Sequence, residues 1–157
     1  MYYTVEEMRV AIDRASEVID SKSSTVEKFT YGYNDCFSLL VEYDKALRGK
    51  ENTRLNEFFK TFGAYKDPRE WLSNMKRVGF DNYKDLAIHS GYEPVRQKKP
   101  KFGDIGYELL RENVGMAMVA GDTHWVSTCP LNNGIHTSRR LVFYERRLLF
   151  LGTPLRS

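Results

Sequence analysis

Long apolar runs, charge of one sign and cysteine are all scarce in this sequence. No apolar stretch reaches the length that a membrane-spanning helix needs, so membrane insertion is not expected. The first seven residues, MYYTVEE, lack the basic and apolar segments of a secretory signal peptide, and none is therefore expected. The two cysteines, Cys36 and Cys129, cannot make a disulfide framework and indicate folding in a reducing compartment. The sequence leaves open whether these two cysteines form a single disulfide.

Charge and ligand motifs are also sparse. The net charge is only +3, and the densest basic run, residues 96–101, is short and bracketed by prolines, which is typical of a solvated loop. A nucleic-acid surface needs a wider basic stripe, so no nucleic-acid partner is expected. No Cys/His cluster has metal-ligand spacing, and no glycine-rich phosphate loop is present. We therefore expect no metal and no cofactor.

What the chain does contain is typical of one globular domain of 157 residues, with 41% hydrophobic and 29% charged residues. Helical spacing and caps predict helices over 4–20, 36–48, 53–62, 67–79 and 81–91, the first with a capping box at Thr4 and Glu7. Short extended runs predict strands over 105–109, 113–119, 123–128, 135–139 and 148–151. The order predicts an α+β fold, with N-terminal helices (about 1–92) packed on a C-terminal antiparallel β-sheet (about 101–152).

One stretch, residues 31–40 (YGYNDCFSLL), has the features of a prepared nucleophile. Asn34 and Asp35 are strong N-cap residues, and an apolar helical face follows them. Cys36 then falls in the first helical turn, where the positive end of the helix dipole favours a thiolate. A free cysteine is also among the most buried residue types and often only packs, so both interpretations stay open here.

Four short motifs follow one another in a distinctive order. They are Tyr-Gly at 31–32, Asp-Cys at 35–36, Gly-Asp-Ile at 103–105 and Val-Gly-Met at 114–116. This order resembles that of the NlpC-type cell-wall cysteine peptidases, a papain-like group, and in particular the divergent NlpC-like proteins of bacteriophage tails. The similarity spans about residues 29–130. It implies a papain-like fold in which Cys36 attacks an amide carbonyl, a histidine acts as base, and a polar third residue orients that histidine.

The sequence departs from the family pattern at three chemical positions. The family histidine position is Asn113, and an asparagine cannot take the thiol proton. If residues 120–122 form a three-residue turn, the third position falls at Trp125, which is not a polar orienter. The family tyrosine corresponds roughly to Phe29. Three of the four expected chemical groups are thus replaced.

His124 is the fallback base. With the three-residue turn, His124 pairs near Met118 and faces away from Asn113, whereas a four-residue turn would bring it to the same side. The spacing of His89 and His136 selects neither of them.

Two functions are therefore carried forward. The resemblance and the lost partners imply an NlpC-like protein with a degenerate site, acting structurally in a phage tail. Its expected partners are other tail proteins, and peptidoglycan is left open as a second partner. The protein would be made in the host cytoplasm and carried into the virion. The alternative is an active cysteine hydrolase, a peptidoglycan endopeptidase or amidase that uses Cys36.

Overall fold

The computed structural model describes residues 1–25, 29–96, 99–111, 114–129, 132–140 and 148–156. Its helices are α1 (Val5–Ser24), α2 (Cys36–Arg48), α3 (Arg54–Phe62), α4 (Pro68–Arg77) and α5 (Tyr83–His89). Its strands are β1 (Tyr92–Pro94), β2 (Ile105–Arg111), β3 (Val114–Ala120), β4 (His124–Cys129), β5 (Asn132–Arg140) and β6 (Leu148–Pro154). The predicted α+β order, helices first and strands afterwards, is confirmed.

Side-chain caps fix where the helices begin. Thr4 forms the expected capping box with Glu7, and Asp67 caps α4 ahead of its first-position proline. The expected cap of α5 at Asp81 is wrong by one residue, because the side chain of Asn82 accepts the N–H of Asp85. The expected end of the first helix near residue 20 is also wrong, since α1 continues through Ser24.

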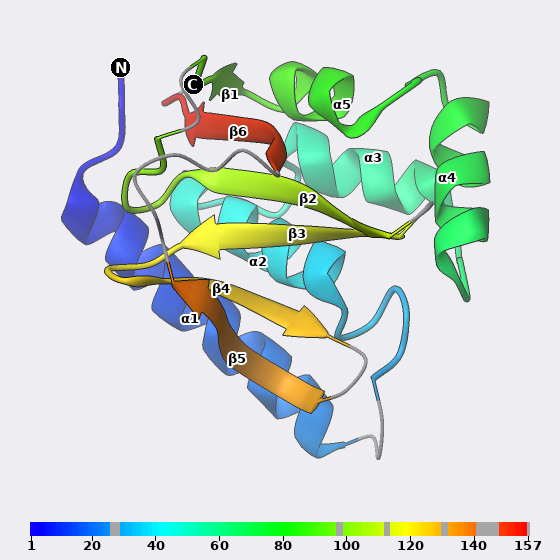
Figure 1. The fold of residues 1–157 in the computed structure, drawn as a ribbon, viewed down its shortest axis with the longest axis horizontal. Helices are drawn as coiled ribbons and strands as arrows, with labels where there is room; N and C mark the ends of the chain where they lie inside the picture. Colours follow the sequence, from blue (N-terminus) through cyan, green and yellow to red (C-terminus); the bar gives the residue numbers. More distant parts are fainter. Residues whose placement is uncertain (26–28, 97–98, 112–113, 130–131, 141–147, 157) are drawn as a thin grey trace.

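The strands form one antiparallel sheet in the order β1-β6-β2-β3-β4-β5. Figure 1 shows α1 and α2 behind this sheet, with α4 standing at the far end of the β2–β3 hairpin and α5 beside β6. The two chain ends lie side by side, and Tyr2 forms a β-bridge with Leu155. The strand β1 was not expected; it is only three residues long and ends in a proline.

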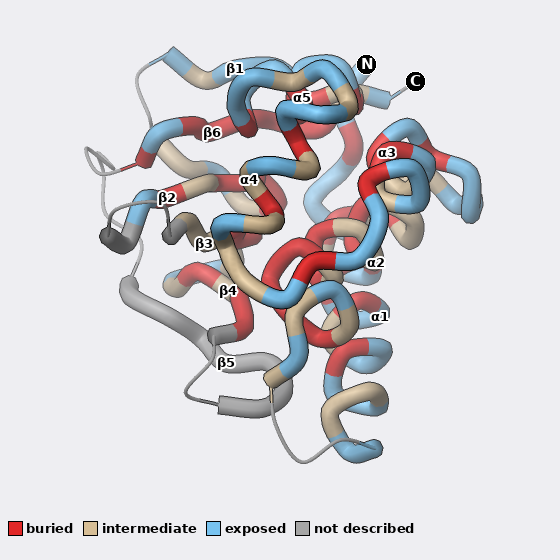
Figure 2. Tube along the Cα trace, turned by 90° about the vertical axis from the view of Figure 1, so that its right-hand side faces the viewer, coloured by how far each residue is buried: buried red, intermediate tan, exposed pale blue. Residues whose placement is uncertain are grey.

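The larger hydrophobic core lies between the helices and the sheet, and α2 is its most central helix. Figure 2 shows the buried segments gathered along α2 and the middle strands. A smaller cluster on the opposite face of the sheet contains Met118, Ala120 and Trp125. Alternate residues of β3 therefore face different cores: Ala117 and Val119 face the helices, and Met118 and Ala120 face away.

Candidate functional site

The turn before α2 holds Cys36 at the first helical position, as the sequence predicts. Asp35 is the N-cap, and its Oδ1 accepts hydrogen bonds from both the backbone N–H (2.9 Å) and the hydroxyl (2.7 Å) of Ser38. Its Oδ2 accepts the N–H of Gly32 at 3.0 Å and the hydroxyl of Tyr65 at 2.5 Å. Gly32 has a φ of 79°, which favours glycine at this turn. The buried carboxylate is thus held by four donors and fixes the entry to α2.

The sulfur of Cys36 lies against β3, where it accepts the backbone N–H of Ala117 at 3.4 Å. The Ala117 N–H can donate to the sulfur because the backbone polar groups of successive β3 residues point alternately toward β2 and toward β4. Ala120 exchanges hydrogen bonds with the β2 side, through Gly103 and Asp104, so the polar groups of Ala117 face β4. The β3–β4 pairing ends at Val119, and two side chains satisfy Ala117 instead. They are Cys36 through its sulfur and Ser127, whose hydroxyl donates to the Ala117 carbonyl at 2.7 Å.

The protonation state expected for Cys36 is not the one that the structure favours. Burial, with the Asp35 carboxylate as a second cause, raises the pKa of the Cys36 thiol well above its ordinary value. The N–H groups of Ala117, Cys36 and Phe37 oppose this shift and are outweighed. Of the two interpretations left open by the sequence, the buried environment therefore favours the packed cysteine, because only 7% of the residue's surface is exposed.

Aromatic side chains that sequence reasoning missed surround the thiol. Burial is the main cause of a raised pKa of Tyr65, Tyr83 and Tyr107, and an electrostatic interaction with Cys36 is a further cause in each, for Tyr65 after the Asp35 carboxylate, so the three phenols lie near the thiol. The rings of Tyr83 and Tyr107 stack with centroids 4.4 Å apart, and Phe37 lies beside both. The alternation of residues along β2 could have revealed that Tyr107 shares the inward face of Ile105. Nothing in the sequence marks Tyr65.

Phe29, at the family tyrosine position, supplies no hydroxyl to the site. Its ring packs edge-on against Tyr31 with centroids 5.0 Å apart, and Tyr31 in turn lies near Tyr65. The hydroxyl that reaches Asp35 comes from Tyr65, 30 residues further along the chain than the cap. Asn113, the family histidine position, lies outside the described residues.

The register between β3 and β4 differs from the one expected, and this changes the position of His124. Ala120 pairs with Trp125, and the N–H of Gly121 donates to the His124 carbonyl at 3.0 Å, so four residues connect the paired positions. His124 therefore shares the helix-facing side with Ala117, contrary to the three-residue-turn expectation. Its ring still lies far from Cys36, because the strand rises about 13 Å over the four residues from Ala117 to Gly121.

His124 instead lies in a separate environment at the β3–β4 turn. Its Nδ1 is 2.9 Å from the Thr123 hydroxyl, and it lines a shallow depression with Asp13 of α1. At this end of the sheet Arg9 and Asp122 form an ion pair of 2.9 Å. The ring of His89 packs against Phe80, and the side chain of His136 lies outside the described ones. Of the two described imidazoles, those of His124 and His89, neither is placed to take a proton from Cys36.

Trp125 does not occupy the third position of a triad. It is fully buried in the cluster on the far face of the sheet, where its ring covers Gly106. Continuing the observed register places Thr128 opposite Ala117, on the helix-facing side. Thr128 is buried, and its hydroxyl has no hydrogen-bond partner among the described residues.

Cys36 is a free thiol, so the open disulfide with Cys129 is not formed. Within the described ranges no group of His, Cys, Asp and Glu side chains could hold a metal ion. No helix in the same part of the chain is both long and apolar enough to cross a membrane.

Comparison with known proteins adds no relative. No family model, curated protein sequence or solved structure matches this chain.

Proposed function

We propose that this chain is a non-hydrolytic NlpC-like protein that acts as a structural or assembly component of a bacteriophage tail. The observation that carries the loss of hydrolysis is the state of Cys36. Its sulfur is buried and accepts the N–H of Ala117, and the titratable side chains described around it are phenols, with no imidazole among the described ones. A papain-like nucleophile needs a base that takes its proton and an open approach for the carbonyl.

The NlpC-like fold and the tail assignment share one source of support, and the fold has a second. The order of motifs in the sequence suggests both. The capped cysteine at the start of α2, packed against the centre of an antiparallel sheet, agrees with an NlpC-like arrangement. Under this proposal the partners are other tail proteins, and peptidoglycan is left open as a second partner. The protein enters the virion after synthesis in the host cytoplasm.

Hydrolysis is tested by digestion of purified peptidoglycan with the chain and with Cys36→Ala, followed by chromatography of the released fragments. An active NlpC peptidase serves as the positive control. We expect neither protein to release fragments above background. Release by the native sequence that Cys36→Ala abolishes would establish the alternative function, a cysteine endopeptidase or amidase.

The tail assignment is tested separately by mass spectrometry of purified virions of the phage that encodes the chain. We expect the chain in the particle, in constant ratio to the other tail proteins. Its absence from particles that contain those tail proteins would contradict the assignment, whatever the digestion experiment shows.

A further inference from the structure

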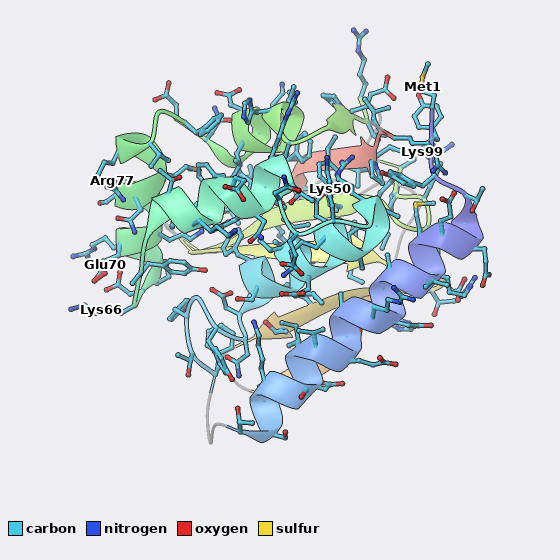
Figure 3. The ribbon with its side chains drawn as sticks, turned by 180° about the vertical axis from the view of Figure 1, so that it is seen from behind. Met1, Lys50, Lys66, Glu70, Arg77 and Lys99 are labelled. Atoms are coloured by element: carbon cyan, nitrogen blue, oxygen red, sulfur yellow. The ribbon has the colours of Figure 1, made fainter. Side chains whose placement is uncertain are left out.

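The loop between α3 and α4, residues 63–67, closes one side of the environment of Cys36. Tyr65 is the one buried residue of this loop, and Lys66, which follows it, is exposed. Figure 3 shows the Lys66 side chain at the start of α4, pointing away from the molecule. A single side chain of the loop, that of Tyr65, therefore enters the fold.

The inner side of Tyr65 faces the turn that carries the thiol. Its hydroxyl donates to Oδ2 of Asp35, the residue directly before Cys36, at 2.5 Å. Its ring packs over Gly32, where an added Cβ would lie 3.6 Å from Tyr65 Cε1. Burial and the Asp35 carboxylate raise the pKa of Tyr65, and the nearby Cys36 adds to the same shift. Tyr65 is thus one wall around the thiol.

The outer side of Tyr65 faces a hollow between α2, α3 and this loop, which we call the α2–α3 cavity. Its volume is about 380 Å³, and Tyr65 lines it together with Tyr31, Phe37 and Phe59. Cys36 is not among the lining residues. Tyr65 therefore stands between the cavity and the thiol, and a ring that moves outward enters the cavity instead of packed side chains.

The other two phenols near the thiol belong to regular elements. Tyr107 lies in β2, opposite Ala117 of β3 on one side and Phe150 of β6 on the other. Tyr83 begins α5 and stacks on Tyr107 with ring centroids 4.4 Å apart. Moving either ring away from the thiol disrupts the core between the helices and the sheet, so the loop of Tyr65 is the wall that is easiest to displace.

Few hydrogen bonds hold this loop in place. In the described part of the chain, no backbone-to-backbone hydrogen bond outside the helices and strands involves residues 63–66. The Asn74 side chain donates to the Ala64 carbonyl at 3.0 Å, and the Tyr65 hydroxyl makes the bond to the helix cap. Gly63, with a φ of 83°, gives the loop a flexible first residue. Segments with so few contacts open locally at a lower free energy than the whole fold.

We propose that Tyr65 is a gate: its side chain separates the α2–α3 cavity from Cys36, and local displacement of residues 63–66 joins the two while the rest of the fold stays intact. The gate rests on the closed state of Cys36, which also carries the proposed loss of hydrolysis, and it is independent of the tail assignment. An open gate exposes the thiol but supplies no base, so opening alone does not restore hydrolysis.

The first test measures how the alkylation of Cys36 by iodoacetamide at pH 8 depends on urea below the unfolding transition. Mass spectrometry of the tryptic peptide gives the rate of the reaction, in which the thiolate displaces iodide. We expect a rate that is nearly independent of urea, because opening of a short loop exposes little surface. A rate that rises with urea as steeply as global unfolding would overturn the gate and leave Cys36 a closed thiol. Labelling as fast as in the unfolded chain would contradict both the gate and the closed thiol.

The second test separates the gate from overall stability with two variants. Tyr65→Phe keeps the ring and removes its bond to the Asp35 carboxylate, so we expect Cys36 labelling at least about tenfold faster. Leu151→Ala destabilises the whole fold from the cluster on the far face of the sheet, and should change the rate in the absence of urea by less than about twofold.

Near-UV circular dichroism verifies that each variant is folded. Equal acceleration by the two variants, or no acceleration by Tyr65→Phe, would overturn the gate. If Leu151→Ala does not fold, the urea dependence of the native sequence and the effect of Tyr65→Phe decide the question without it.

Discussion

At the scale of single residues, Cys36 shows how burial overrides a local helix effect. A charge at a helix end is stabilised by about 0.3–1 kcal/mol where it is exposed. Full burial can shift a pKa by several units, and each unit corresponds to about 1.4 kcal/mol. Burial is the largest cause of the raised pKa of Cys36, and the Asp35 charge acts in the same direction. The same cap that starts the helix therefore disfavours the thiolate.

The glycine of the Val-Gly-Met motif, Gly115, has a steric reason to be a glycine. A Cβ added there would lie 1.9 Å from the Tyr107 hydroxyl oxygen, so the Tyr107 ring occupies the space that a side chain would need. We expect Gly115→Ala to lower the free energy of unfolding by about 1–3 kcal/mol in urea denaturation, the usual cost of overpacking. In a Tyr107→Leu background the same substitution should cost less. An equal cost in both backgrounds would contradict this assignment.

Asp104 gives a residue-scale prediction of pH dependence. Burial raises the pKa of this carboxyl from 3.8 to about 6, although the Lys101 N–H and the Thr153 hydroxyl donate to it and lower the pKa. Because the folded pKa is the higher one, the folded state binds the proton more tightly. This contribution to stability is therefore present below about pH 4 and is lost as the pH rises through 6, by roughly 2–3 kcal/mol.

Asp104→Asn removes that proton equilibrium and should flatten the fall in stability between pH 4 and 6, measured by urea denaturation across this range. Asp122→Asn is the control, because the exposed Asp122 is paired with Arg9, which lowers its pKa. That variant should keep the fall. An Asp104→Asn profile parallel to the native one would show that the buried carboxyl does not titrate as inferred.

At the scale of elements, the start of α2 depends on Tyr65, a residue far from it in sequence. The Tyr65 hydroxyl donates to the buried Asp35 carboxylate, and a hydrogen bond to a charged group contributes about 1.5–3 kcal/mol. We expect Tyr65→Phe to lower the free energy of unfolding by that amount. Tyr33→Phe, which removes a hydroxyl next to the exposed Thr25, should change it by less than about 0.5 kcal/mol. Similar effects of the two variants would contradict the special role of Tyr65.

The same scale shows what could be predicted from the sequence. The caps at Thr4, Asp35 and Asp67 were predictable because they depend on neighbouring residues alone. The β3–β4 register was not, because it depends on how many residues the turn between Ala120 and Trp125 uses. A shift by three residues moved Trp125 to the opposite face of the sheet. The phenols around Cys36 come from separate elements, and only packing brings them together.

At the scale of the whole molecule, the C-terminal end of α2 joins the α5–β1 turn and the C-terminal end of the chain to the core. Arg48 forms a buried ion pair of 2.8 Å with Asp44, whose side chain also accepts the Tyr92 hydroxyl at 2.6 Å. The Arg48 guanidinium donates to the carbonyls of Ser90, Gly91 and Leu155. The helix α2 thus holds Cys36 at its first residue, and its last residue, Arg48, holds the edge of the sheet.

Arg48→Met would leave the Asp44 carboxylate buried without its cation, so we expect a loss of about 3–5 kcal/mol in the free energy of unfolding. Lys45→Met removes a cation of the same helix whose partners are Glu42 and the exposed Glu51, and should cost less than about 1 kcal/mol. Chemical denaturation of both variants measures the difference. Comparable losses would mean that the Arg48 pair does not join these segments as inferred.

The central claim, that Cys36 is a closed and protonated thiol, is tested most directly by its rate of alkylation with iodoacetamide as a function of pH. Tryptic digestion places Cys36 and Cys129 on different peptides, so mass spectrometry measures each cysteine in the native sequence. In urea, Cys36 should titrate near the ordinary cysteine pKa of about 8.5. In the folded protein we predict slow labelling with no inflection up to about pH 10, because burial raises the pKa. Fast labelling with an inflection below about pH 7 would contradict the account and indicate an activated nucleophile.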